Sequence, residues 1–186
     1  PLVVVPPEAG PFREALGESL DYVEQRQPKG TGDALAVALQ HLHGAPEHLL
    51  VLNGDLPLIR SETVKALAQQ HLAADADMTL LTSTRVPSEG LGRVLRNAAG
   101  VPIAIVEATD AGEETDALPE VNVGVYCFKT SWVMGAMQAI EPSKGGEVYL
   151  TRLVELASRQ GARTVTHVLS DPLEGMGVNT RLDLAQ

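Results

Sequence analysis

The sequence predicts a single α/β domain in which helices flank a mixed, mostly parallel sheet. Short apolar runs alternate with segments whose apolar residues have helical spacing through the first half of the chain. Hydrophobic residues make up 44% of the 186 residues, enough to bury a core without disulfides or metal ions. Aromatic residues account for only 3%, so we expect a core of Val, Leu, Ile and Ala.

The first half is predicted to alternate strands and helices. Leu35, Leu39 and Leu42 have helical spacing, and Ser61 with Glu62 marks the start of a second helix. Ligands of such sheets bind at the carboxyl ends of the strands, so the turns that follow the strands are candidate binding segments. Strands are predicted at 2–5, 20–24, 48–52 and 78–82, and helices at 33–42 and 61–73.

The second half is predicted to begin with a β-hairpin at 90–107, whose turn lies at 97–100. The acidic stretch at 110–116 predicts an exposed, mobile loop. Two further strands complete the sheet, and two further helices flank a glycine-rich loop at 141–147. These strands are predicted at 120–126 and 165–169, and the helices at 129–140 and 149–160.

The net charge of −10 limits the partners of this chain. Nucleic acid or an anionic membrane would favour a basic face, so neither is expected as a partner. An anionic small substrate would instead need a divalent cation, backbone N–H groups at a helix start, or a few positioned Lys and Arg residues.

Cys127 is the only cysteine and stands in an apolar run at 123–128. The run predicts a buried, unreactive thiol, and a single cysteine excludes an intramolecular disulfide, which fits a reducing compartment. No apolar run approaches the roughly 20 residues that a membrane-spanning helix needs. We therefore expect a cytoplasmic protein.

A polar, glycine-containing turn stands between the strand at 20–24 and the helix that follows it. Gly30 and Gly32 lack the β-carbons that would keep a planar base and its ribose away from the backbone, and Gln25 offers an amide donor and acceptor. Thr31 could contact a ligand or cap the helix. The turn predicts a nucleotide-reading loop, with ordinary helix capping as the alternative.

Polar residues also follow the predicted strands, which would bring them together at one edge of the sheet. Asp55 follows a fully apolar strand, where a carboxylate could hold Mg²⁺ together with substrate phosphates and water. Asn179 could supply an amide oxygen to the same ion. The alternative for Asp55 is a turn closed by Pro57, and for Asn179 a helix cap.

Glu107 and Asn122 also stand in or after strands, and their side chains would suit the hydroxyl groups of a sugar. Such residues could equally serve solubility. Gly92 and Gly124 would allow close approach of a ligand, although β-bulges use glycine in the same way.

Seven sequence blocks, taken in order, are similar to the uridyltransferase domain of the bacterial bifunctional N-acetylglucosamine-1-phosphate uridyltransferase and glucosamine-1-phosphate acetyltransferase. The resemblance implies the Rossmann-like fold of nucleotide-diphospho-sugar transferases. It also implies a reaction of UTP with N-acetylglucosamine 1-phosphate, with Mg²⁺ as cofactor, to give pyrophosphate and UDP-N-acetylglucosamine for cell-wall precursors. The blocks are Gln25 with 30–32, 53–58, 92–93, 106–107, 120–124, 146–151 and 177–181.

The resemblance also implies roles for individual residues, which fall into three groups. Gln25, Gly30 and Thr31 match the group that reads uracil, while Asp55 and Asn179 match the catalytic Mg²⁺ pair. In-line attack on a phosphorus atom needs charge neutralisation and alignment, so no nucleophilic Ser or Cys is expected. The residues that match the sugar site are Gly92, Glu107, Asn122, Glu147 and Tyr149.

The family pattern extends beyond both ends of the chain. Its glycine-rich signature loop precedes the segment that matches 1–5, and its β-helical acetyltransferase half, which would drive trimer formation, follows residue 186. We therefore expect 1–186 to be one nucleotidyltransferase domain, truncated at its N-terminus, of a homotrimeric parent. Ala108 and Asn53 depart from the residues common in the family, Lys and Tyr. The alternatives are another sugar-phosphate nucleotidyltransferase, or a non-catalytic domain that binds nucleotide sugars.

Overall fold

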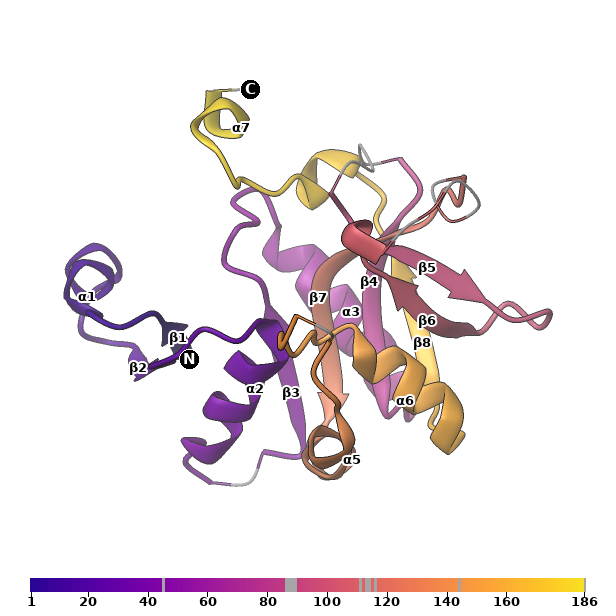
Figure 1. Ribbon diagram of the computed structural model, residues 1–186, viewed down its shortest axis with the longest axis horizontal. Coiled ribbons are helices and arrows are strands. Elements are labelled where there is room, and N and C mark those ends of the chain that lie inside the picture. Colours follow the sequence, from indigo (N-terminus) through magenta and orange to yellow (C-terminus); the bar gives the residue numbers. More distant parts are fainter. Residues whose placement is uncertain are drawn as a thin grey trace.

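Two sheets organise the chain, as a computed structural model shows (Figure 1). The structure describes residues 1–44, 46–85, 90–110, 112, 115, 117–143 and 145–185. Among these residues, one sheet has two strands and the other has six. The strands are β1 (Leu2–Val5), β2 (Asp21–Glu24), β3 (His48–Leu52), β4 (Met78–Ser83), β5 (Arg93–Arg96), β6 (Pro102–Val106), β7 (Val121–Lys129) and β8 (Thr164–Val168).

The larger sheet is mixed, as predicted, and β7 is its central strand. β3 and β4 both pair antiparallel with β7, and β8 pairs parallel with β4. β3, β4 and β8 therefore run in one direction, and β7 is inserted against them. The prediction of a mostly parallel sheet does not hold for neighbouring strands, because most of the pairs in this sheet are antiparallel.

The direction of β7 determines which strand ends lie side by side. Because β7 runs opposite to β3 and β4, its first residues lie beside the last residues of both neighbours, for example Asn122 opposite Thr82. The predicted β5–β6 hairpin is present and joins the same region, since Arg93 pairs with Val121. The carboxyl ends of β3 and β4, the start of β7 and the hairpin therefore share one edge.

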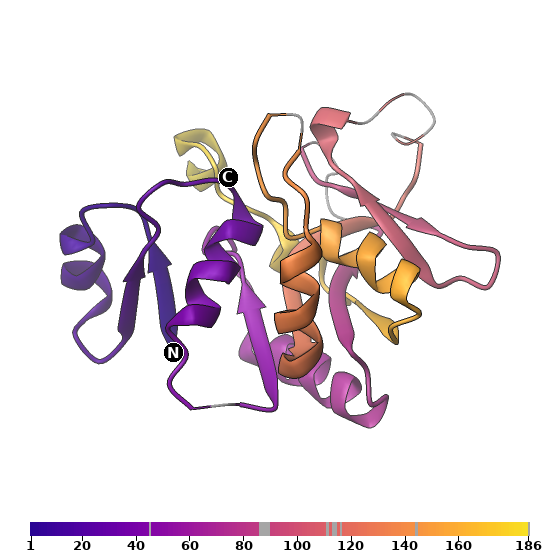
Figure 2. The ribbon, with the colours of Figure 1, turned by 60° about the horizontal axis from the view of Figure 1, so that its bottom comes forward.

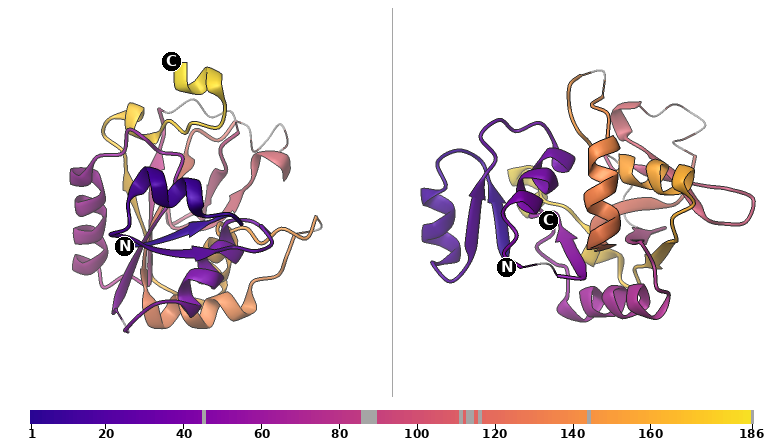
Figure 3. Two further views of the ribbon diagram at one scale, coloured as in Figure 1. Left: turned by 90° about the vertical axis from the view of Figure 1, so that its left-hand side faces the viewer. Right: turned by 90° about the horizontal axis from the view of Figure 1, so that it is seen from below.

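Helices cover both faces of the larger sheet (Figure 2). Seen from below, α5 and α6 lie on one side of the strands and α3 on the other (Figure 3). α1 was not predicted, and its Pro11 stands at the helix start, where a missing N–H costs little. The helices are α1 (Gly10–Leu16), α2 (Thr31–Gln40), α3 (Ser61–Ala73), α5 (Thr130–Ala136), α6 (Arg152–Gln160) and α7 (Arg181–Ala185), with 3₁₀ turns η1 (Ala108–Asp110), η2 (Met137–Ala139) and η3 (Pro172–Gly175).

The side chains of β7 alternate between two core clusters, as a strand buried on both faces requires. Tyr126 and Phe128 join the cluster under α2, α5 and α6, whereas Val125 and Cys127 join the cluster over α3. The first cluster contains stacked aromatic rings, since Phe128 lies between Tyr126 and Trp132. Three of the six aromatic residues thus belong to or pack against this cluster, which the prediction of a purely aliphatic core did not anticipate.

Cys127 is buried and unpaired, as predicted, and burial raises the pKa of its thiol to about 11. Within the described residues, no helix is long and apolar enough to cross a membrane. Four residues of the acidic stretch at 110–116 and Lys144 of the glycine-rich loop lie outside the described residues, so neither predicted loop is described in full.

Candidate functional site

A cavity of about 570 Å³ opens at the edge of the sheet where β3 ends and β7 begins. It receives side chains from the loops after β3 and β8, from the hairpin, from the start of β7 and from the segment before α6. Seven of the ten predicted site residues line it: Thr31, Asp55, Gly92, Glu107, Asn122, Tyr149 and Asn179.

Asp55 and Asn179 approach each other in the lining of this cavity. Gly177 separates them, because a β-carbon on Gly177 would lie 3.6 Å from Asp55 Oδ2 and 3.7 Å from Asn179 Nδ2. The backbone N–H of Val178 donates to the Asp55 carbonyl at 2.8 Å, which fixes the two loops side by side. The two predicted metal ligands therefore lie together, although they are 124 residues apart in the sequence.

The Asp55 carboxylate fits a hard cation. Its Oδ1 atom is buried, and it has no hydrogen-bond partner in the part of the chain that the structure describes. A buried carboxylate oxygen without a donor is costly, and a bound cation would offset that cost. The described residues contain no group of three or more His, Cys, Asp or Glu side chains that could hold a metal. An ion here would therefore need further ligands from substrate and water, as Mg²⁺ commonly does.

Glu107 and Tyr149 also line the cavity, and each is held by a neighbour. Thr151 Oγ1 donates a hydrogen bond to Glu107 Oε1. Tyr149 donates its hydroxyl hydrogen to Glu147 Oε2, and this bond to a carboxylate raises the pKa of Tyr149. Glu147 itself lies outside the cavity lining, so the structure places it behind Tyr149. Thr151, which sequence analysis assigned to a helix, also lines the cavity.

Asn122 is 9% exposed, and its amide is oriented by the protein. Its Nδ2 donates to the Tyr126 hydroxyl at 2.7 Å, and its Oδ1 accepts from the Gly124 N–H at 3.3 Å. Burial raises the pKa of Tyr126 well above its usual range, so this hydroxyl stays neutral. Sequence analysis missed Tyr126, because it stands in an apolar strand where only its hydroxyl distinguishes it from a core residue.

Gly92 and Gly124 are both required by packing. A β-carbon on Gly92 would lie 2.6 Å from Ile105 Cγ2, and one on Gly124 would lie 2.3 Å from Asn53 Nδ2. Gly124 also has φ of +87°, a region that disfavours other residues, and it lies where the β4–β7 register shifts. Gly124 thus lies at an irregularity of the β4–β7 ladder and also in the lining of the cavity, where both alternatives place it.

The loop between β2 and α2 packs on the segment before α6. Val148 N–H donates to Lys29 O at 2.7 Å, and Gly32 N–H donates to Val148 O at 2.8 Å. A β-carbon on Gly30 would lie 2.7 Å from that same Val148 oxygen. The missing β-carbons of this loop therefore allow the backbone of Val148 to pack closely against it. Thr31 Oγ1 accepts from the Leu150 N–H at 3.1 Å and does not cap α2 through its side chain.

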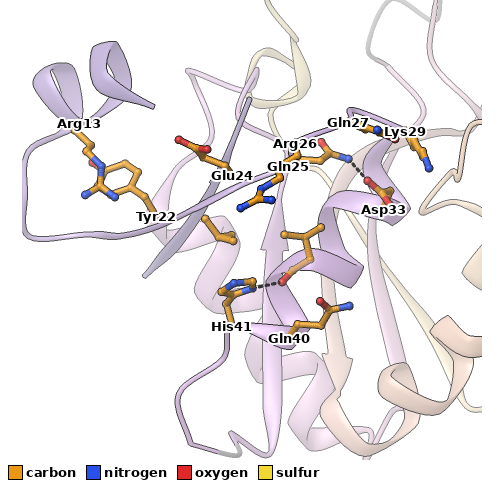
Figure 4. Close-up of a pocket in the computed structure, with 12 residues that line it drawn as sticks. Arg13, Tyr22, Glu24, Gln25, Arg26, Gln27, Lys29, Asp33, Gln40 and His41 are labelled. Atoms are coloured by element: carbon orange, nitrogen blue, oxygen red, sulfur yellow. Dashed lines mark hydrogen bonds between the residues drawn. The ribbon is translucent and has the colours of Figure 1, made fainter. Parts of the chain in front are cut away.

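Gln25 faces a second cavity of about 730 Å³, which lies between β2 and α2 (Figure 4). Its Nε2 donates to Asp33 Oδ2 at 2.6 Å and to Gly30 O at 3.2 Å. The predicted uracil group is thus divided in the structure, with Thr31 in the first cavity and Gln25 in the second. Gly30 lines neither of them.

The fold and the cavity at the strand ends define a nucleotidyltransferase domain. The family model described as MobA-like NTP transferase domain matches residues 1–171, and the chain belongs to this family.

Relatives that match the whole chain carry the name bifunctional protein GlmU. The protein of Geobacter sulfurreducens is 37% identical over 188 residues, and that of Heliobacterium modesticaldum is 36% identical over 187 residues. The protein of Streptococcus equi subsp. zooepidemicus is 37% identical over 186 residues. Each match covers 100% of this chain and 40 or 41% of the relative, so the chain spans about two fifths of these relatives. The resemblance drawn from the sequence blocks is confirmed.

Proposed function

We propose that this chain is the nucleotidyl-transferring part of an enzyme that joins UTP to N-acetylglucosamine 1-phosphate, giving UDP-N-acetylglucosamine for cell-wall precursors. The observation that carries the proposal is the cavity at the strand ends, whose lining contains the pair Asp55 and Asn179 together with Glu107, Asn122 and Tyr149. The first pair suits phosphates with a cation, and the other three suit the hydroxyl and acetamido groups of a sugar. Similarity to proteins named bifunctional protein GlmU supports this choice of substrates.

The chemistry is an in-line displacement. An oxygen of the sugar 1-phosphate attacks the α-phosphorus of UTP, and the bond to the oxygen that bridges to the β-phosphate breaks, so that pyrophosphate leaves. Asp55 and Asn179 would hold Mg²⁺, which when bound neutralises charge on the phosphates. Asn122, oriented by Tyr126, would hold the sugar, and Glu107 would accept from a sugar hydroxyl beside Thr151. The protein thus aligns the reactants and needs no covalent intermediate.

Calorimetry with UDP-N-acetylglucosamine and MgCl₂ tests the proposed substrates. UDP-glucose and a guanine nucleotide sugar serve as controls, and we expect both to bind at least about tenfold more weakly, since each leaves buried polar groups unpaired. Tighter binding of the guanine nucleotide sugar would overturn the assignment of uridine. Equal binding of UDP-glucose would overturn the acetamido sugar while leaving a uridylyltransferase. A companion assay of pyrophosphate release from UTP and N-acetylglucosamine 1-phosphate separates an enzyme from a binding domain.

A further inference from the structure

The segments that follow β3 and β8 lie at the same end of the larger sheet (Figure 1). They carry Asp55 and Asn179, and hydrogen bonds of Arg60 join them. We propose that Glu174 is a positioning residue for the Asp55–Asn179 pair, which it aligns by fixing Arg60. The inference rests on the proposed function, because it assigns Glu174 to the cation site of that function. The Arg60 cluster consists of Arg60, Asp171 and Glu174.

Glu174 holds the backbone of the loop after β3. Its carboxylate belongs to η3 and is 4% exposed, and its Oε2 accepts a hydrogen bond from the Arg60 N–H at 3.0 Å. A carboxylate removed from water is destabilised unless it is hydrogen-bonded, so this contact favours one position of the loop. The two residues are 114 positions apart, which makes the bond a tie between two distant segments.

The side chain of Arg60 makes a second tie to the same turn. Its Nη2 lies 2.8 Å from Asp171 Oδ2, and Asp171 Oδ1 in turn accepts from the Leu173 N–H at 3.1 Å, at the start of η3. This ion pair is largely exposed on the Arg60 side, so we expect it to contribute less than the buried bond of Glu174. Arg60 is thus held by η3 through both its backbone and its side chain.

The Arg60 cluster and the candidate metal pair are connected by two short segments of the chain. Arg60 comes five residues after Asp55, and Glu174 comes five residues before Asn179. Val178, which lies between Glu174 and Asn179, donates its N–H to Asp55 O, and Leu56 and Leu169 belong to the same core cluster over α3. Loss of the Glu174 tie would leave these loops joined by the exposed Arg60–Asp171 ion pair and by the bond from Val178 to Asp55 beside the metal pair. A shift of the loop after β3 would then alter the separation of the two metal ligands.

A purely structural role is the competing explanation. Arg60 precedes α3, so a carboxylate on its N–H also compensates the positive end of the α3 dipole. That role would change the stability of the protein and would leave cation affinity unaltered. Metal binding and thermal unfolding therefore separate the two roles.

The test is Glu174→Gln, which keeps the shape of the side chain and removes its charge. We would titrate Mn²⁺ in the presence of UDP-N-acetylglucosamine, following free Mn²⁺ by electron paramagnetic resonance. Loss of a group that bonds directly to a metal ligand typically weakens metal binding about 10- to 100-fold. Because Glu174 acts on the ligands through Arg60, we expect the lower end of this range, about a tenfold increase in the Mn²⁺ dissociation constant. At saturating metal, the KM for UTP should change less than about threefold, because the nucleotide contacts are intact.

Glu120→Gln is the matched control. Glu120 is another largely buried carboxylate bound to an arginine, Arg96, but it lies on the hairpin side of the sheet. We expect it to lower the unfolding temperature without changing Mn²⁺ affinity. Should Glu174→Gln fail to fold, Asp171→Asn removes only the exposed tie of the Arg60 cluster and is expected to weaken Mn²⁺ binding about two- to threefold.

Wild-type Mn²⁺ affinity in Glu174→Gln, or in Asp171→Asn where that variant is needed, would overturn the positioning role, whatever the unfolding temperature. Failure of the proposed function has a different signature. In that case, the wild-type protein and Asp55→Asn would bind Mn²⁺ equally, and both the cation site and the positioning role would be overturned.

Discussion

The carboxylate oxygens at the site differ in whether they have a hydrogen-bond partner. Asp55 Oδ1 is buried and unpaired among the described residues, whereas the oxygens of Glu107 and Glu147 accept hydrogen bonds from Thr151 and Tyr149. These carboxylates differ in their surroundings rather than in their chemistry. The unpaired oxygen is the one suited to a cation, and the paired ones are suited to orienting neutral groups.

Asp55→Asn should lower Mg²⁺-dependent pyrophosphate release by at least about 100-fold, because the lost ligand removes several kcal/mol of stabilisation of the phosphoryl transition state. The fold should persist, since Oδ1 has no hydrogen-bond partner to lose among the residues that the structure describes. Circular dichroism checks the fold, and pyrophosphate release checks turnover. Turnover of Asp55→Asn at the wild-type rate would contradict the assignment of Asp55 as a metal ligand.

Tyr126→Phe removes the hydroxyl that holds Asn122 and keeps the ring that stacks on Phe128. We expect a loss of about 1–3 kcal/mol in the free energy of unfolding, because a buried amide hydrogen is left unpaired. The KM for the sugar phosphate should rise by about tenfold and the KM for UTP should stay within about twofold. An equal rise in both constants would contradict a role for Tyr126 on the sugar side alone.

At the scale of the elements, the glycines of the site serve chain packing. The positive φ of Gly124 and its contact with the Asn53 side chain place this residue where the β4–β7 ladder shifts register. A strand that must bend at one point next to a cavity commonly does so with a bulge. The direction of the Asn122 side chain therefore depends on a backbone feature two residues away.

Gly124→Ala should destabilise the protein by about 2 kcal/mol or more, because it adds a β-carbon 2.3 Å from Asn53 Nδ2 in a strained backbone conformation. Gly135→Ala in α5 is the control. Nothing lies within 4 Å of its added β-carbon, and alanine favours helix by up to about 1 kcal/mol. Urea unfolding should move in opposite directions for the two variants. A neutral Gly124→Ala would show that the bulge can relax.

Most elements were predictable from sequence because each depends on a local pattern. The apolar runs of β3, β4 and β7 and the helical spacing of α2 and α3 lie at or within a few residues of the predicted ranges. α1 was missed because seven residues beginning with Gly10 and Pro11 carry little helical pattern. The neighbours of β7 were not predictable, since strand order follows from contacts between distant segments.

The residues of the candidate site likewise divide into those that a local sequence pattern predicts and those that depend on contacts between distant segments. Asp55 and Asn179 were found because residues that follow strands gather at one edge, a rule that needs no side-chain detail. Asn122 was found as a polar residue inside a strand of small residues. Tyr126 and Thr151 were missed, because their roles come from single hydrogen bonds, to Asn122 and to Glu107. The inward turn of Gln25 toward Asp33 depends on where α2 begins, and the sequence placed that start two residues late.

For the whole molecule, a buried histidine links stability to pH. His71 is fully buried, with Nδ1 at 2.9 Å from Thr79 Oγ1 and Nε2 at 3.0 Å from His48 Nδ1. Burial and the neighbouring His48 lower the pKa of His71, although Asp75 and Asp77 act in the opposite direction. The folded protein therefore resists protonation of this ring, which lies between α3 and the β3–β4 side of the sheet.

Stability should fall as the pH drops below about 6.5, the unfolded pKa of histidine, because the unfolded chain then takes up protons that the folded chain does not. The contribution of His71 is fully present above that pH and is lost progressively toward the lowered folded pKa. His71→Gln should be less stable at neutral pH and should lose less stability between about pH 7 and pH 5. Urea midpoints measured across this range check the prediction, and parallel slopes for both proteins would refute it.

The register shift of β7 has a consequence for how this chain can change in length. Leu80 pairs with Tyr126, and Thr82 pairs with Asn122. Between these two pairs, β4 advances by two residues and β7 by four, so β7 contains two extra residues. Side chains alternate between the two faces of a strand, so an even number of extra residues leaves Asn122 and Tyr126 on the same face. Their side chains can therefore meet in a hydrogen bond. Deletion of a single residue between them would invert that parity and turn Asn122 toward α3. Length variation in this strand is therefore compatible with the cavity only in steps of two residues.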